Sequence, residues 1–131
     1  MIGLDTNVLV RYLTQDEPAQ TRRANRLIGE TVAAGDRCAI ASIVMCELVW
    51  VLDSAYRLER DAIASVLERL LATADFVVEE PDLVRRALAD YRRGHGDFAD
   101  YLIGWRNRHT GCDATATFDR ALRGSDLFRV L

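Results

Sequence analysis

Four acidic residues that are far apart in the chain each occupy a position where a carboxylate can serve chemistry. Asp5 and Asp119 each follow a short run of small or apolar residues, and Glu47 is the only acid inside an otherwise apolar segment. Asp100 lies three residues after Asp97, at the start of a further apolar segment. Carboxylate oxygens without histidine or thiolate partners are the ligands that Mg²⁺ or Mn²⁺ prefers. Such ions promote hydrolysis of phosphate esters, so the four acids favour a phosphodiesterase acting on nucleic acid.

Each acid also has an ordinary structural explanation. Asp5, Thr6 and Asn7 are all residue types that cap helix N-termini. Glu47 can avoid the cost of an unpaired buried charge by facing solvent. Asp97 and Asp100 lie on one face of a helix start, where the helix dipole favours acids. The metal-site interpretation therefore depends on all four acids meeting at one edge of a sheet.

The elements that would position these acids alternate between strands and helices. We expect strands over residues 2–4, 37–41, 76–78, 114–119 and 127–130, and helices over residues 6–13, 18–35, 43–56, 59–72 and 81–91, with a last helix that Asp97 caps. Ser42 is the expected N-cap of the helix that contains Glu47. This alternation predicts an α/β fold with a mainly parallel sheet, and such sheets place ligands at the carboxyl ends of their strands.

Composition excludes several classes of phosphate-binding enzyme. The chain has 131 residues, a length typical of one domain, and all 17 of its basic residues are arginines. Walker-type phosphate loops and protein kinases need a lysine, so both classes are excluded. The three cysteines have no paired spacing, and no apolar run approaches the length of a membrane span. We therefore expect a cytoplasmic protein without a membrane segment.

Arginine-rich positions near the later acids are candidates for phosphate contact, because guanidinium groups bind phosphate in a bidentate manner. The segment Arg92-Arg93-Gly94-His95-Gly96 reads as a basic loop, and Arg106 and Arg120 follow two of the acids. A solvated turn and a general bias towards arginine are the alternative explanations. The net charge of −3 does not favour a basic coat over the whole surface.

The sequence resembles a known family in four motifs: LDTN at residues 4–7, the lone Glu47 in its apolar helix, DFADYLIGW at 97–105 and TFDRAL at 117–122. In order and spacing they are similar to PIN-domain ribonucleases, specifically the VapC-type toxins of bacterial toxin–antitoxin systems. The resemblance implies a single PIN domain over residues 1–131, with a PIN-like α/β/α sandwich and a central, mainly parallel sheet of four to five strands. Trp105 departs from the family pattern, which commonly has a small residue at this position.

The resemblance also implies roles for individual residues. Asp5, Glu47 and Asp100 would be the core acids that hold Mg²⁺ or Mn²⁺, with Asp119 as a fourth. The residues expected to support them are Thr6, Asn7, Asp97 and Thr117. Without a metal, the grouped carboxylates are expected to repel one another.

The implied activity is metal-dependent endoribonucleolytic cleavage of structured RNA, such as transfer or ribosomal RNA, leaving a 5′-phosphate and a 3′-hydroxyl. The implied partners are the RNA substrate, a cognate antitoxin protein and a second copy in a homodimer. Apolar side chains around Val49, Trp50 and Leu67 are candidates for dimer or antitoxin contact, and core packing is the favoured role for most of them. Two other functions stay open: a PIN-fold nuclease acting on DNA or maturing RNA, and a catalytically inactive binding module.

Overall fold

The computed structural model describes residues 1–131. Its elements follow the expected order, with ends shifted by one or two residues: β1 (Ile2–Gly3), α1 (Thr6–Thr14), α2 (Pro18–Ala33), β2 (Cys38–Ile40), α3 (Ser42–Ser54), α4 (Arg60–Ala72), β3 (Phe76–Val78), α5 (Pro81–Arg93), α6 (Phe98–His109), β4 (Thr115–Thr117), the 3₁₀ helix η1 (Arg120–Leu122) and β5 (Phe128–Val130). Only η1 was not expected. No helix combines the length and apolar character that crossing a membrane requires.

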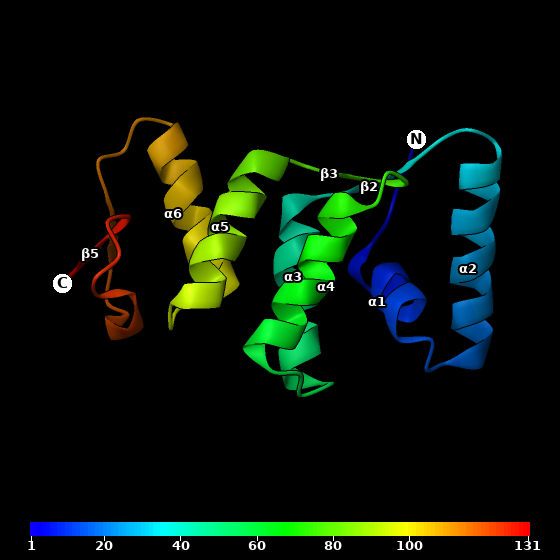
Figure 1. Cartoon of the computed structure of the whole chain (residues 1–131), viewed down its shortest axis with the longest axis horizontal. Helices are drawn as coiled ribbons and strands as arrows, with labels where there is room; N and C mark the ends of the chain where they lie inside the picture. The colour runs from blue at the N-terminus through cyan, green and yellow to red at the C-terminus, as the bar shows by residue number, and fades with distance from the viewer.

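All five strands are parallel to their neighbours, which confirms the predicted α/β fold with four to five parallel strands. They form two sheets, one with the order β1-β2-β3 and one in which β4 pairs with β5. Figure 1 shows the first sheet beside α1 and α2, and β5 at the other end of an elongated molecule. Helices α3, α4, α5 and α6 lie between these ends.

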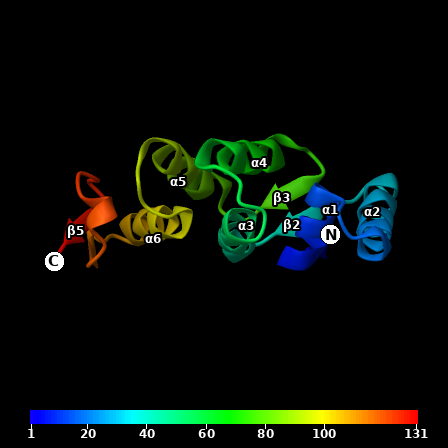
Figure 2. The same ribbon diagram turned by 90° about the horizontal axis from the view of Figure 1, so that it is seen from below.

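Helices hold the two ends together through a continuous apolar core. Figure 2 shows α4 above β3, and α5 and α6 beyond them towards β5. The core runs from Leu9 of α1 through Leu48 of α3 and Val84 of α5 to Phe98 of α6, all of them fully buried. Each of these helices carries apolar residues three or four positions apart, so one stripe of each faces its neighbours.

The apolar residues proposed for partner contact have different environments. Val49 and Leu67 are buried in the core, which confirms core packing, the favoured role, for both. Trp50 is 70% exposed, and Ile43, one turn before Glu47, is 67% exposed. Glu47 therefore lies on an exposed stripe of α3 between two large apolar side chains.

Helix α3 begins differently from the prediction. Ala41 occupies the N-cap position and offers no side-chain cap, so the assignment of Ser42 as N-cap is wrong. The cap comes from Glu79, which follows β3: its Oε1 accepts hydrogen bonds from the backbone nitrogen of Ser42 at 3.0 Å and from Ser42 Oγ at 2.9 Å. These hydrogen bonds lower the pKa of Glu79. The end of β3 thereby fixes the start of the helix that carries Glu47.

Candidate metal site

Asp5 and Glu47 are joined through Thr6. Strand β1 leads within two residues into α1, so Asp5 becomes the N-cap of α1 and its Oδ1 accepts a hydrogen bond from the Thr6 nitrogen at 2.8 Å. The Thr6 hydroxyl donates to Glu47 Oε1 at 2.9 Å, across the contact between α1 and α3. Thr6 is 7% exposed, whereas the two acids are exposed. We call Asp5 and Glu47 the N-terminal acid pair, which Thr6 links.

The expected capping role of Asp5 is confirmed, and it is compatible with a role in metal binding. One carboxylate oxygen, Oδ1, is held by the helix start. A carboxylate has two oxygens and about four lone-pair sites, so capping leaves it capacity to bind a cation. The same reasoning applies to Glu47, whose Oε1 alone is bonded to Thr6.

A second group of acids lies where α6 begins and β4 ends. Asp97 is the N-cap of α6 but makes no side-chain cap hydrogen bond, and Asp100 lies in the first turn. Partial burial raises the pKa of Asp100, and the negative charges of Asp97 and Asp119 raise it further. We call Asp97, Asp100 and Asp119 the C-terminal acid group. The negative charges of Asp97 and Asp119 thus disfavour ionisation of Asp100.

Hydrogen bonds hold Asp119 at the end of β4. Its Oδ1 accepts from the Ala121 nitrogen at 2.9 Å, which caps η1, and its own nitrogen donates to Thr117 Oγ1 at 3.1 Å. Thr117 therefore holds the backbone of Asp119, whereas Thr6 holds the carboxylate of Glu47. Asn7, by contrast, is exposed and lines a cavity between α1 and α2 with Arg11.

The two acid groups do not meet within one chain. Nowhere in the molecule do three His, Cys, Asp or Glu side chains lie close enough together to share a metal ion. Figure 1 shows β1 and α1 on one side of α3, and α6 and β5 on the other. The donor atoms suit Mg²⁺ or Mn²⁺ in type, because all are carboxylate oxygens, but their positions in a single chain do not form a complete site.

Most of the arginines proposed for phosphate contact are paired with acids. Arg92 binds Glu68 at 2.6 Å, Arg93 binds Asp90 at 2.9 Å, and Arg106 binds Glu80 at 2.9 Å. Arg120 is exposed and has no carboxylate partner. Only Arg120 therefore offers an uncompensated charge among the four residues that the sequence singled out.

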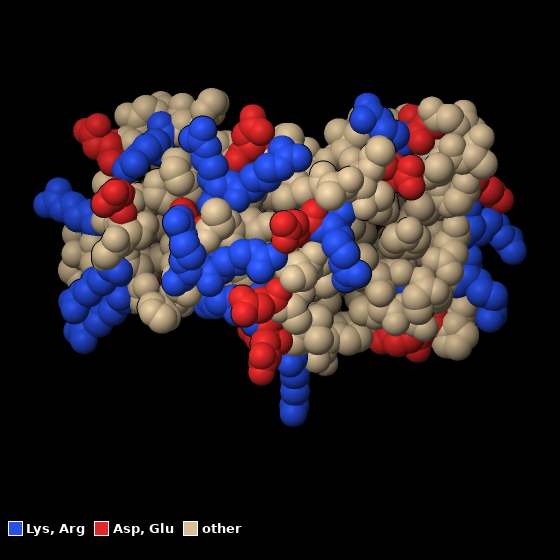
Figure 3. All heavy atoms as spheres, viewed as in Figure 1, with Lys and Arg blue, Asp and Glu red and all other residues tan.

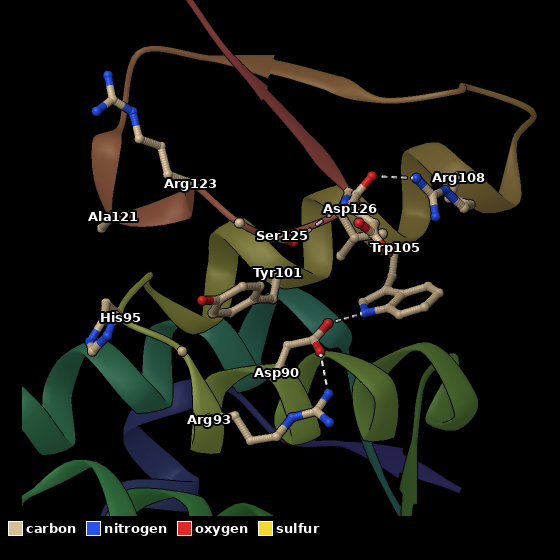
Figure 4. Close-up of a pocket in the computed structure, with 13 residues that line it drawn as sticks. Asp90, Arg93, His95, Tyr101, Trp105, Arg108, Ala121, Arg123, Ser125 and Asp126 are labelled. Carbon is tan, nitrogen blue, oxygen red and sulfur yellow. Dashed lines mark hydrogen bonds and ion pairs between the residues drawn. The ribbon is translucent and has the colours of Figure 1, made fainter.

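A basic cavity of about 520 Å³ lies between the α5–α6 connection and the C-terminal segment. Figure 4 shows Arg93, His95, Arg108 and Arg123 around it, with Trp105 and Tyr101 at its base. Trp105 Nε1 donates to Asp90 Oδ2 at 2.7 Å, which fixes the indole ring at the base of the cavity. Arg123 makes no ion pair and was missed by sequence reasoning, because nothing in its local spacing places it beside α6.

Comparisons with known proteins cover nearly the whole chain. The PIN domain family matches residues 2–125. A protein of Aquifex aeolicus (strain VF5) named VapC ribonuclease is 28% identical over 120 residues, which cover 92% of this chain and 88% of the relative. The family match spans all four acids that the sequence singled out.

Proposed function

Because the chain belongs to the PIN-domain family, we propose that it is a metal-dependent endoribonuclease of the VapC type, the toxin of a type II toxin–antitoxin pair. The observation that carries this proposal is the hydrogen-bonded arrangement of Asp5, Thr6 and Glu47. It holds two carboxylates from different elements beside one hydroxyl, with oxygens left for a cation. The similarity to a VapC ribonuclease supports RNA as the substrate.

The four acids are the residues proposed to bind Mg²⁺ or Mn²⁺. When bound, such an ion supplies Lewis acidity towards a phosphodiester. Thr6 positions Glu47, and the α1 start positions Asp5, so neither carboxylate has to be ordered when the cation arrives. The Asp119 carboxylate is held by the Ala121 nitrogen, and Thr117 holds the Asp119 backbone.

The distribution of charge favours RNA binding on the C-terminal part of the chain. Residues 81–131 contain nine arginines and seven acids, whereas residues 1–80 contain eight arginines and thirteen acids. Figure 3 shows many arginine side chains over the half of the molecule formed by α5, α6 and the residues that follow. An RNA backbone is attracted to such a surface without regard to sequence.

A direct assay separates the proposal from its alternatives. Purified protein is incubated with structured RNA or with single-stranded DNA, in Mn²⁺ or in excess EDTA. We expect RNA fragments with 5′-phosphates and 3′-hydroxyls in Mn²⁺ only. Equal cleavage of DNA would favour a nuclease of broader substrate range. No cleavage, together with no thermal shift on adding Mn²⁺, would favour a binding module.

The proposed partners are a cognate antitoxin and a second copy of the chain, in the cytoplasm. Ile43 and Trp50 are exposed on both sides of Glu47, so an antitoxin segment with apolar residues would cover the N-terminal acid pair when it binds there. Co-expression with the protein encoded next to this chain tests the pairing. We expect co-expression to relieve the growth arrest that the chain causes when it is expressed alone. Growth arrest that persists would contradict the pairing.

A further inference from the structure

The connection between α5 and α6 is held through its backbone at Gly96. The Gly96 nitrogen donates to Tyr101 Oη at 3.1 Å, and the Gly96 carbonyl accepts from Arg60 Nη1 at 2.8 Å. Gly96 is buried, and it lies directly before Asp97, the N-cap of α6. Because Asp100 lies in the first turn of the same helix, a shift of Gly96 would move Asp100 with it.

Two glycines let this connection lie against Tyr101. A Cβ added at Gly94 would overlap Tyr101 Oη, and one added at Gly96 would overlap the Leu122 side chain of η1. Figure 4 shows the Tyr101 hydroxyl pointing towards the connection that carries His95. The glycines of this basic loop therefore have a packing role, which accounts for them without a bound phosphate.

Arg60 reaches this connection from the start of α4, 36 residues earlier in the chain. The same Nη1 also donates to the Tyr91 carbonyl in the last turn of α5, at 2.9 Å, and the guanidinium carbon lies 4.3 Å from the centre of the Tyr91 ring. The last carbonyls of a helix lack partners within the helix, and a cation there also complements the helix dipole. The Arg60 guanidinium thus joins the end of α5 to the residue before Asp97.

Arg60 is half-buried and makes no ion pair, in contrast to Arg92 and Arg93 of α5. Two carbonyls and an aromatic ring order its guanidinium, whose planar fork suits such a site. We propose, building on the proposed function, that Arg60 is a positioning residue for RNA cleavage: through Gly96 it fixes the start of α6 and with it the Asp100 carboxylate. This role requires no contact between Arg60 and the RNA.

Steady-state kinetics of two Arg60 variants test the positioning role. Arg60→Met keeps an apolar stem but removes the donor to the carbonyls of Gly96 and Tyr91. Misplacing a reacting group by about 1 Å can cost about 100-fold in rate, so we expect kcat for RNA cleavage to fall by about 10- to 100-fold. KM should stay within about twofold of the wild-type value, because RNA binding is not altered. Arg60→Lys retains donors for both carbonyls, so it should recover most of the lost kcat.

The matched control is Arg69→Met, which removes the same charge from an exposed position on the same helix. Its kcat should equal that of the wild type. Urea unfolding of every variant identifies conditions in which all of them are folded, and kcat is compared under those conditions. A loss of stability is then not mistaken for a loss of positioning.

Tyr101→Phe provides a second test that does not depend on the folding of the Arg60 variants. It keeps the aromatic ring and removes only the hydroxyl that accepts from the Gly96 nitrogen. We expect kcat to fall as in Arg60→Met. Amide hydrogen exchange at Gly96 should become faster in both variants, because each loses a bond that holds the connection.

A folded Arg60→Met protein with wild-type kcat would refute the proposal. A higher KM at unchanged kcat would also refute it, since Arg60 would then act in RNA binding. Failure of the proposed function is distinguishable, because the wild-type protein itself would then cleave no RNA. The positioning role would fall with it, although hydrogen exchange at Gly96 would still respond to Arg60→Met.

Discussion

Thr6 fixes the position of Glu47 relative to Asp5, since its hydroxyl donates to Glu47 and its backbone nitrogen donates to Asp5. Replacing Thr6 by Val keeps its volume and its backbone N–H but removes the hydroxyl donor to Glu47. We expect the rate of RNA cleavage and the affinity for Mn²⁺ to fall by about 10- to 100-fold, as for other residues that orient metal ligands. Thr14→Val, at the other end of α1, is the control and should leave both quantities unchanged. If the Thr6→Val protein cleaves RNA and binds Mn²⁺ as the wild type does, Glu47 does not need Thr6 to orient it.

Asp100 is predicted to destabilise the metal-free fold. Its pKa is raised in the folded protein, so the folded state resists ionisation more than the unfolded chain does. Stability is therefore lost as pH rises from the ordinary aspartate pKa through the raised one. Asp100→Asn should abolish cleavage and yet be as stable as wild type, or more stable, at pH 7 in EDTA, with the difference vanishing in acid. Urea unfolding at several pH values measures this, and marked destabilisation at pH 7 would contradict it.

At the level of elements, Glu79 links the end of β3 to the start of α3. Glu79→Ala should lower the free energy of unfolding by about 1 kcal/mol, the usual cost of losing a helix cap. Because hydrogen bonds from Ser42 lower the pKa of Glu79, this stabilisation is present above the ordinary glutamate pKa and is lost as pH falls through the lowered value. Urea unfolding at pH 7 and pH 3 measures the change. Glu30→Ala, on exposed α2, should have no effect, and an equal loss there would contradict the capping role.

The sequence was informative about elements and much less so about their ends. Apolar periodicity located every strand and α-helix, and Pro18 and Pro81 marked two helix starts correctly because proline fits the first turn. The cap of α3 was predicted wrongly because a local rule favours Ser42. Glu79, 37 residues later, supplies the cap, and a contact at that separation leaves no local signal.

At the level of the whole molecule, the charge difference between the two halves predicts that RNA binds the arginine-rich C-terminal part. Arg123 lines the basic cavity without an acidic partner, so Arg123→Ala should weaken RNA binding. The slope of log Kd against log salt should decrease by about 1, as for the loss of one phosphate contact. Fluorescence anisotropy in EDTA, where cleavage is absent, measures the slope. Arg22→Ala, on α2, is the control, and equal slopes for both variants would place the RNA elsewhere.

The convergence of the acids is what the sequence alone could not establish. The sequence identified the residues because each follows a strand or begins a helix. Which strands become neighbours depends on backbone hydrogen bonds, and these carry no side-chain signal. The prediction of one site therefore needed the order of strands in the sheet, and in one chain that order leaves β1 and β4 apart.

The central claim is that acids from both ends of the molecule bind the same divalent ion. Isothermal titration of Mn²⁺ into wild type, Asp5→Asn and Asp100→Asn tests it most directly. We predict that the wild-type protein binds Mn²⁺ and that either substitution lowers the affinity at least about tenfold, since each removes a ligand of the same ion. If either variant binds Mn²⁺ as tightly as the wild type, the two acid groups do not act together and the account is wrong.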